Sequence, residues 1–208
     1  MARRNAVIGP PMRAYYERRA REYDDWWLGT GRFADRDRPG WRDEVEELVE
    51  LVGALPAVKT LDVACGTGFL TRHLRGELTA IDQSPGMVEI ARERLPEARV
   101  LEAEAVPLPF AAGEFARIFT GHFYGHLDPD ERKAFLAEAR RVGGELVVVD
   151  SAVHEGVEPE EWQERVLDDG SRHRVYKRFF DGDGLAAELG GGEVLHAGEW
   201  FVVVRAAG

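Results

Sequence analysis

Two features of this sequence, a pair of glycines and a strand-end acid, could together bind a small polar ligand. Gly66 and Gly68 follow closely on the apolar run 60–64, and Asp82 ends the next apolar run, 78–81. Glycine lets main-chain groups approach a ligand that a side chain would obstruct. An acid at the tip of the neighbouring strand can accept hydrogen bonds from ribose hydroxyls. The arrangement therefore predicts a site for a nucleoside.

The glycine spacing separates two classes of nucleoside ligand. A dinucleotide fingerprint has a third glycine three positions after the second, where this chain has Thr71. That departure disfavours a cofactor with a pyrophosphate group. A nicotinamide-dependent oxidoreductase stays open as an alternative, because a strand-end acid would also suit the ribose of NAD. Binding of NAD would support that alternative.

Alternating strands and helices are expected to position these residues. Apolar runs predict strands over 60–64, 78–81, 99–103, 115–120 and 146–149. Helices are predicted between them over 67–75, 85–95 and 129–141. Continuous apolar strands linked by helices predict a parallel sheet covered on both faces, whose ligands bind at the carboxyl ends of the strands.

The two ends of the chain fall outside that alternation. Aromatic residues at helical spacing predict a helix over 12–27, and a second amphipathic helix follows over 45–55. In the tail, Trp162 and Val166 suggest a helix, whereas 172–180 looks extended. A short helix is expected near 185–189, before a hairpin formed by 193–197 and 200–205. An antiparallel pair at the edge of the sheet is the natural interpretation of that hairpin.

Composition limits the partners of the protein. A chain of 208 residues suits one domain, and a formal charge of −11 argues against nucleic acid. Six arginines stand in residues 1–21, which we interpret as a solvated terminus beside an amphipathic helix. No apolar run reaches the roughly 18–20 residues that span a bilayer, and no secretory signal is recognised.

Cys65 is the only cysteine, so neither an internal disulfide nor a metal site is expected. We expect a cytoplasmic monomer or homodimer without membrane or nucleic-acid partners.

Four segments, in order along the chain, resemble the motifs of one enzyme family. Residues 60–70, 80–87, 102–110 and 141–146 are similar to motifs of the class I S-adenosylmethionine-dependent methyltransferases, in the small-molecule branch that includes ubiquinone/menaquinone methyltransferases. The resemblance implies a doubly wound, mostly parallel seven-stranded α/β sheet with an antiparallel C-terminal hairpin. It also implies one methyltransferase domain over 1–208, made of a lid segment (1–40), a cofactor-binding core (58–150) and a substrate-side region with the hairpin (151–208).

The resemblance implies S-adenosyl-L-methionine as the methyl donor and assigns its methionine and ribose contacts. Main-chain groups of Ala64, Gly66 and Gly68 would hold the methionine moiety. Asp82 would bind the ribose, and Thr120 would lie under the sulfonium.

Further residues are assigned to the adenine and to the lid. Gln83 and Met87 would flank the ring, Glu104 would accept from its amino group, and the Ala105 amide would reach a ring nitrogen. The family usually has aspartate where Glu104 stands. In the resembling enzymes an N-terminal helix covers the cofactor, and Tyr23 would be its nearest residue.

Side chains that could serve as a base follow the fourth and fifth strands. A base is needed only when the acceptor carries a proton, as phenols, acids and amines do. The candidates are His122, Tyr124 and His126 at the end of the fourth strand, with His154 beyond the fifth. A structural or cofactor-side role for His126 and a solvated loop position for His154 are the simpler interpretations.

The resulting hypothesis is a methyltransferase that acts on an oxygen or nitrogen atom of a small, partly apolar molecule. The alternative is a protein that binds S-adenosylmethionine without transferring its methyl group, such as a sensor or an assembly partner. Titration with the cofactor followed by a screen of acceptors separates the two.

Overall fold

The structure is a computed structural model, and it describes residues 10–208. Its centre is a seven-stranded sheet in the order β3-β2-β1-β4-β5-β9-β8. The strands are β1 (Thr60–Val63), β2 (Leu78–Asp82), β3 (Arg99–Glu102), β4 (Phe115–Gly121), β5 (Gly143–Ser151), β8 (Glu193–Ala197) and β9 (Phe201–Ala207). The first five run parallel, and β9 pairs antiparallel with both β5 and β8. The predicted fold class is thereby confirmed. Arg3 and Arg4 of the arginine-rich start lie outside the described residues.

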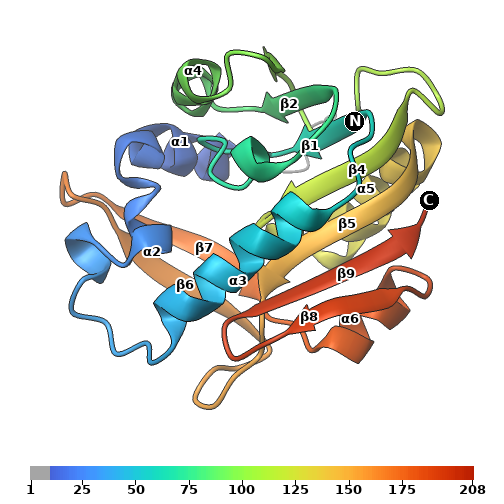
Figure 1. Cartoon of the computed structure of the whole chain (residues 1–208). Helices are drawn as coiled ribbons and strands as arrows, with labels where there is room; N and C mark the ends of the chain where they lie inside the picture. Colours follow the sequence, from blue (N-terminus) through green and yellow to red (C-terminus); the bar gives the residue numbers. More distant parts are fainter. Residues whose placement is uncertain (1–9) are drawn as a thin grey trace, which may run out of the picture.

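Helices cover both faces of the sheet. They are α1 (Pro10–Arg19), α2 (Asp25–Leu28), α3 (Trp41–Ala54), α4 (Pro85–Arg94), α5 (Pro129–Val142) and α6 (Gly182–Glu188), with short 3-10 turns η1 (Ala20–Glu22), η2 (Gly31–Phe33), η3 (Thr71–His73) and η4 (Tyr124–His126). Helix α3 crosses one face of the sheet, and α5 and α6 lie on the other (Figure 1). Within residues 10–208 no helix combines the length and the apolar character needed to cross a bilayer.

Side-chain alternation along the central strands produces two separate apolar cores. In β5, Leu146 and Val148 pack with α5 and α6, whereas Val147 and Val149 pack with α3. Successive side chains of a strand point to opposite faces, so a continuous apolar run fills both cores. This is why the uninterrupted valines of β5 predicted a central strand correctly.

Capping residues begin two of the helices where the sequence predicts. The Ser84 hydroxyl accepts a hydrogen bond from the Met87 amide at 3.2 Å, at the start of α4. At the start of α5, Asp128 accepts from the Glu131 amide and Glu131 accepts from the Asp128 amide, a reciprocal capping box.

Two predicted helices are wrong. Residues 67–75 form only the short turn η3, because Gly66 and Gly68 both adopt the left-handed region and the chain turns sharply there. Trp162 and Val166 belong to a strand, β6 (Glu160–Val166), which pairs with β7 (Arg172–Arg178) in a separate antiparallel sheet. Opposite charges face each other in that hairpin, as in the pair Glu161 and Lys177.

The N-terminal helices and the β6–β7 hairpin gather at the carboxyl ends of the parallel strands (Figure 1). The predicted single helix over 12–27 is divided into α1, η1 and α2. Glu17 of α1 accepts hydrogen bonds from the Ser84 hydroxyl (2.6 Å) and the Gly86 amide (2.9 Å). On its other side, the Tyr15 ring lies 5.2 Å from the His173 ring of β7. Helix α1 therefore joins α4 to the hairpin across the strand ends.

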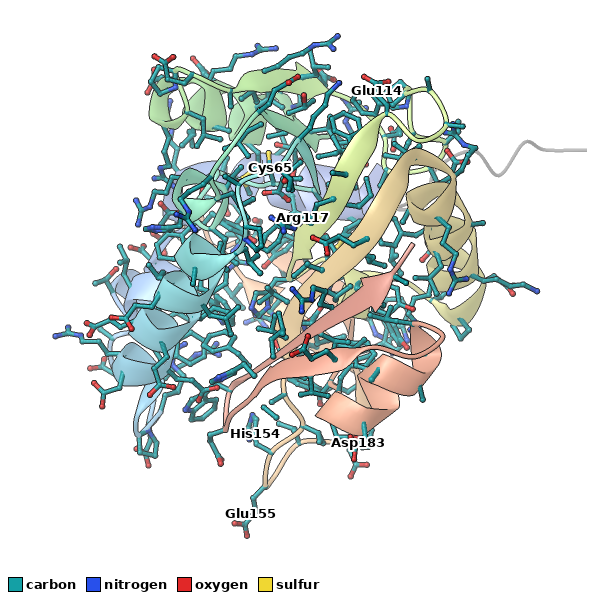
Figure 2. All side chains as sticks on the ribbon, turned by 45° about the vertical axis from the view of Figure 1, so that its right-hand side comes forward. Cys65, Glu114, Arg117, His154, Glu155 and Asp183 are labelled. Atoms are coloured by element: carbon teal, nitrogen blue, oxygen red, sulfur yellow. The ribbon has the colours of Figure 1, made fainter. Side chains whose placement is uncertain are left out.

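One departure from the resembling family has a structural explanation. The family usually has an acid where this chain carries Ala116 and Arg117. Arg117 is buried in β4, where its guanidinium pairs with Glu145 of β5 at 2.6 Å and donates to the Pro56 carbonyl at 2.8 Å (Figure 2). The arginine is thus held within the sheet by its neighbours.

Candidate functional site

A cavity lies at the carboxyl ends of the parallel strands. The residues around it come from the N-terminal helices, the β1 turn, the end of β2, and the loops after β3 and β4. They are Tyr16, Tyr23, Ala64, Gly66, Asp82, Gln83, Met87, Ala103, Glu104, Ala105, His122, Phe123 and His126. Most of the cofactor residues predicted from sequence therefore line one cavity, together with two of the candidate bases.

The backbone beside this cavity is unusual. Among the described residues, Ala64 (φ 59°) and His122 (φ 55°) are the non-glycine positions with positive φ, and both line the cavity. Such backbone costs energy and tends to persist at functional sites. Gly66 (φ 57°) lies against Tyr23, whose ring would be 3.3 Å from an added Cβ. Glycine at this position keeps the main chain of the turn accessible.

Asp82 is held rigidly by the main chain. Its Oδ2 accepts from the Gly66 amide and its Oδ1 from the Ser84 amide, each at 2.9 Å. Burial raises the pKa of Asp82 to about 6, although these amide hydrogen bonds oppose that increase. A carboxylate oxygen can accept two hydrogen bonds, so each oxygen retains a position for a further donor. A vicinal diol would supply two such donors.

Another part of the cavity lining combines apolar surface with one unsatisfied polar atom. Met87 is buried against it, and Gln83, Glu104 and Ala105 form its edge. The Gln83 Oε1 atom is buried and has no hydrogen-bond partner within residues 10–208. Leaving such an atom unpaired costs about 1–3 kcal/mol. A ligand with an apolar ring and an amino group would fit these groups.

Asp62 is a site residue that the sequence reasoning missed. It is buried in β1, where its Oδ2 accepts from the Thr71 hydroxyl at 2.5 Å and its Oδ1 has no partner among the described residues. Burial raises the pKa of Asp62 to about 8. It borders a small hollow shared with Tyr23 and Ala64, beside the main cavity. Its position four residues before Gly66, within the apolar run that leads into the glycine turn, was the available signal.

Three predicted site residues do not line the cavity. The Thr120 hydroxyl donates to the Val63 carbonyl at 2.8 Å, and the Gly68 amide donates to the Cys65 carbonyl at 2.9 Å. The prediction for Tyr124 as a base needs correction, because η4 directs this side chain away from the cavity. Its hydroxyl donates to Glu188 of α6 at 2.9 Å, and burial raises its pKa.

His122 and His126 are both held as neutral imidazoles. Burial lowers the pKa of each well below its usual value, and the charge of Lys177 lowers it further. The Nδ1 atom of His126 lies 2.7 Å from the Tyr176 carbonyl, which can only accept, so this nitrogen carries the proton and Nε2 is basic. The His122 Nε2 atom has no partner within the described part of the chain.

A second, larger hollow of about 1200 Å³ adjoins the cavity and shares Tyr16, Tyr23, His122 and His126 with it. Aromatic side chains of Trp26, Trp41, Phe179 and Trp200 line part of its wall. His154, on the loop after β5, also borders it, with its ring 4.7 Å from Trp200 (Figure 2). A molecule in this hollow would meet a ligand of the first cavity beside the two histidines.

Comparison with known families agrees with this architecture. Residues 60–143 match the family described as a methyltransferase domain. A demethylmenaquinone methyltransferase of Renibacterium salmoninarum is 35% identical over 116 residues, which cover 53% of this chain and 47% of that protein. A malonyl-[acyl-carrier protein] O-methyltransferase of Serratia marcescens is 40% identical over 76 residues, 34% of this chain and 30% of that protein. The chain spans about half or less of the length of these relatives.

Similarity to solved structures extends over the whole fold. The structure of a complex of DhpI with SAM and HEP superimposes with a TM-score of 0.77, covering 99% of both chains at 23% sequence identity. Residues 60–143 are thus similar in sequence to a methyltransferase domain, and the strand order and the TM-score show that the chain shares the fold of that solved structure. A demethylmenaquinone methyltransferase of Thermotoga maritima is likewise 35% identical over 118 residues, which cover 53% of this chain and 49% of that protein.

Proposed function

We propose that this protein is an S-adenosylmethionine-dependent methyltransferase that modifies an oxygen or nitrogen atom of a small, partly apolar molecule. One observation carries the proposal. A single cavity gathers the β1 turn, the strand-end acid Asp82 and the apolar pocket at Met87, and it opens beside two neutral histidines into a second hollow.

The residues present fit the methyl donor group by group. Asp82 would accept from the two ribose hydroxyls, while Gln83, Met87, Glu104 and Ala105 would surround the adenine. The main chain at Ala64 and Gly66 would hold the methionine moiety, and Tyr23 would cover it.

Asp62 extends these contacts to the ammonium group of the methionine moiety. A positive charge beside Asp62 would favour the ionised carboxylate and so lower its raised pKa. Gly68 and Thr120 shape the turn and strand beneath these groups.

The histidines would assist transfer to a protonated acceptor. When bound, S-adenosylmethionine would supply the methyl group: a lone pair of the acceptor would form a bond to the methyl carbon in line with the carbon–sulfur bond, which breaks and leaves its electron pair on the sulfur of the demethylated product. The protein holds the two molecules in contact where its two hollows meet, and this positioning accounts for much of the acceleration. His122 or His126 would take the proton that an O–H or N–H acceptor loses, because both rings line the junction, the His126 Nε2 is unprotonated and the His122 Nε2 has no hydrogen-bond partner among the described residues.

Other parts of the functional hypothesis stay predictions. We propose the division into a lid segment (1–40), a cofactor-binding core (58–150) and a substrate-side region (151–208), because Tyr16 of α1 and Tyr23 flank the first cavity and β6–β7 flanks the second. A cytoplasmic location, a monomeric or homodimeric state, and the lack of nucleic-acid and membrane partners are part of the same proposal.

Calorimetric titration with S-adenosylmethionine and its demethylated product, followed by an acceptor screen, tests the proposal. We expect binding of both compounds, with release of the demethylated product in the presence of a suitable acceptor. Binding without product from any acceptor would support the non-catalytic alternative, a sensor or assembly partner. Binding of NAD in place of S-adenosylmethionine would favour an oxidoreductase and overturn the proposal.

A further inference from the structure

We propose that the methyl acceptor is a small organic oxyanion, a molecule with a carboxylate or phosphate group, and that Arg19, Arg36 and Arg165 bind this group in the second hollow. The inference rests on the proposed function and adds the chemical class of its substrate. It concerns how the acceptor is held, whichever of its atoms receives the methyl group.

The charge of the second hollow is opposite to that of the protein. The chain carries a formal charge of −11. The hollow is nevertheless lined by five cationic side chains and one acidic side chain, Asp37. The cations come from the end of α1, the loop before α3, and both strands of the β6–β7 hairpin: Arg19, Arg36, Arg38, Arg165 and Lys177. Segments far apart in the sequence thus bring like charges together at one place.

Two of these cations have close partners within the protein. The Lys177 ammonium pairs with the buried carboxylate of Asp150 at 2.5 Å, which balances its charge. The Arg38 guanidinium lies 3.8 Å from the ring centre of Trp41 and donates to the Trp26 carbonyl at 3.2 Å, so it is turned toward the tryptophans.

The other three guanidiniums lack a countercharge. No carboxylate of residues 10–208 lies within ion-pair distance of Arg19, Arg36 or Arg165. Arg19 is only 7% exposed, and its hydrogen-bond partner is the neutral Tyr15 hydroxyl at 3.1 Å. Taking a charge out of water without a counterion is costly. Stacking on the Tyr23 ring, 4.8 Å away, offsets only part of that cost.

These three guanidiniums are also close enough to repel one another. Burial lowers the pKa of Arg165, and the charges of Arg19 and Arg36 lower it further. The three side chains line the same hollow, and Arg165 also donates a hydrogen bond to Gln163, two residues earlier on β6. Each guanidinium presents several N–H donors in a planar fork that matches a carboxylate or phosphate. A bound oxyanion would relieve the repulsion and use the free donors.

The position of this cluster suits an acceptor. Arg19 lies one helical turn after Tyr16 and stacks on Tyr23, and both tyrosines border the cofactor cavity as well as the second hollow. An oxyanion here would leave the rest of a small molecule between the aromatic wall at Trp26 and the two histidines. The same arrangement would place its reacting atom toward the methyl donor.

Binding of simple probes to the protein saturated with the demethylated cofactor product tests the inference. Benzoate and phenyl phosphate are compared by calorimetry with neutral benzamide, at constant ionic strength. We expect the two anions to bind and benzamide to bind at least about tenfold more weakly, because it lacks the charge-assisted hydrogen bonds. Equal binding of benzamide and benzoate would overturn the proposal. The relative affinities of the two anions distinguish a carboxylate site from a phosphate site.

Matched variants locate the site. Arg36→Gln and Arg165→Gln should each weaken binding of the anions about tenfold, with the dissociation constant for S-adenosylmethionine unchanged. Neither side chain is part of the buried core, since Arg36 is exposed and Arg165 half-buried. Arg174→Gln is the control, because it removes an exposed arginine of the same hairpin outside the hollow and should change neither affinity.

Two results of these measurements separate the inference from the proposed function. If Arg36→Gln and Arg165→Gln weaken cofactor binding and leave anion binding intact, the guanidiniums serve the cofactor carboxylate and the inference is wrong. If the wild-type protein does not bind S-adenosylmethionine at all, the proposed function fails. Titration of the cofactor-free protein with benzoate and benzamide would then still show whether the basic hollow selects oxyanions.

Discussion

The two hollows of this protein are built in opposite ways. The cofactor cavity takes most of its residues from short segments between Ala64 and Ala105, directly after β1, β2 and β3. The second hollow takes its charged residues from Arg19 to Lys177, on elements that surround the sheet. Under the proposed function, recognition of the nucleoside would depend on local motifs at strand ends, whereas recognition of the acceptor would depend on how peripheral elements assemble.

The two hollows also differ in the sign of their charged side chains. Asp82 and Glu104 line the cofactor cavity, with Asp62 nearby, which suits a donor that carries a sulfonium and an ammonium group. Arg19, Arg36 and Arg165 line the second hollow. Complementary potentials of this kind guide each ligand to its own side and disfavour the wrong one. Exchange of ligands between the hollows would therefore be penalised.

The largest expected effect concerns the histidines where the hollows meet. Replacing the base, by His122→Gln or His126→Gln, should lower kcat for an O–H or N–H acceptor about 10²-fold or more. Because burial and Lys177 lower the pKa of both imidazoles, wild-type kcat should stay constant with falling pH to below about 6.5. The pH profile of each variant identifies the base, since only its replacement removes the decrease at low pH. If neither variant changes kcat, the acceptor needs no base.

Asp82→Ala should affect only the cofactor side. Loss of a charged hydrogen-bond acceptor worth about 1.5–3 kcal/mol should weaken S-adenosylmethionine binding by about one to two orders of magnitude. Binding of benzoate to the second hollow should stay unchanged. Asp183→Ala, which removes an exposed acid of α6, is the matched control (Figure 2). Calorimetry would contradict the assigned cavity if Asp82→Ala bound the cofactor as tightly as the control does.

Asp62 should make the cofactor-free protein less stable as pH rises. Its pKa is raised by burial from 3.8 to about 8, so its contribution to stability is present below about pH 4 and is lost as pH rises through about 8. The melting temperature should therefore fall between about pH 4 and pH 8, and Asp62→Asn should flatten this decrease. Thermal unfolding followed by circular dichroism measures both slopes. Equal slopes would show that Asp62 does not titrate in this range.

The smallest effect is expected for Tyr124. Tyr124→Phe removes a hydrogen bond to Glu188 and should cost about 1 kcal/mol of unfolding free energy. Because this hydroxyl points away from both hollows, kcat and cofactor affinity should stay the same. Denaturant unfolding and steady-state kinetics check the two statements. A large loss of kcat would return Tyr124 to the candidate bases.

Much of the fold could be predicted because its signals are local. The apolar runs of β1, β2, β4 and β5 are continuous, and Ser84 and Asp128 begin their helices by contacts within a few residues. The helix predicted over 67–75 failed because the conformation of Gly66 and Gly68 turns the chain before a helix can begin. The strand β6 was mistaken for a helix because its partner β7, which supplies its hydrogen bonds, follows later in the chain.

The same distinction holds for the functional site. Asp82 and the glycine turn were recognisable because a strand end and a tight turn place their groups within one motif. Tyr124 was misassigned because neighbours in sequence need not face the same way once η4 turns the chain.

Local sequence was thus sufficient to specify a nucleoside-binding edge of a parallel sheet. The cluster of Arg19, Arg36 and Arg165 had no local signal, because α1, the loop before α3 and β6 approach one another only after the two cores have packed. Like charges that repel in an extended chain come together only where burial of apolar surface elsewhere compensates the repulsion. The nucleoside site therefore follows from short motifs, and the character of the acceptor site follows from long-range packing.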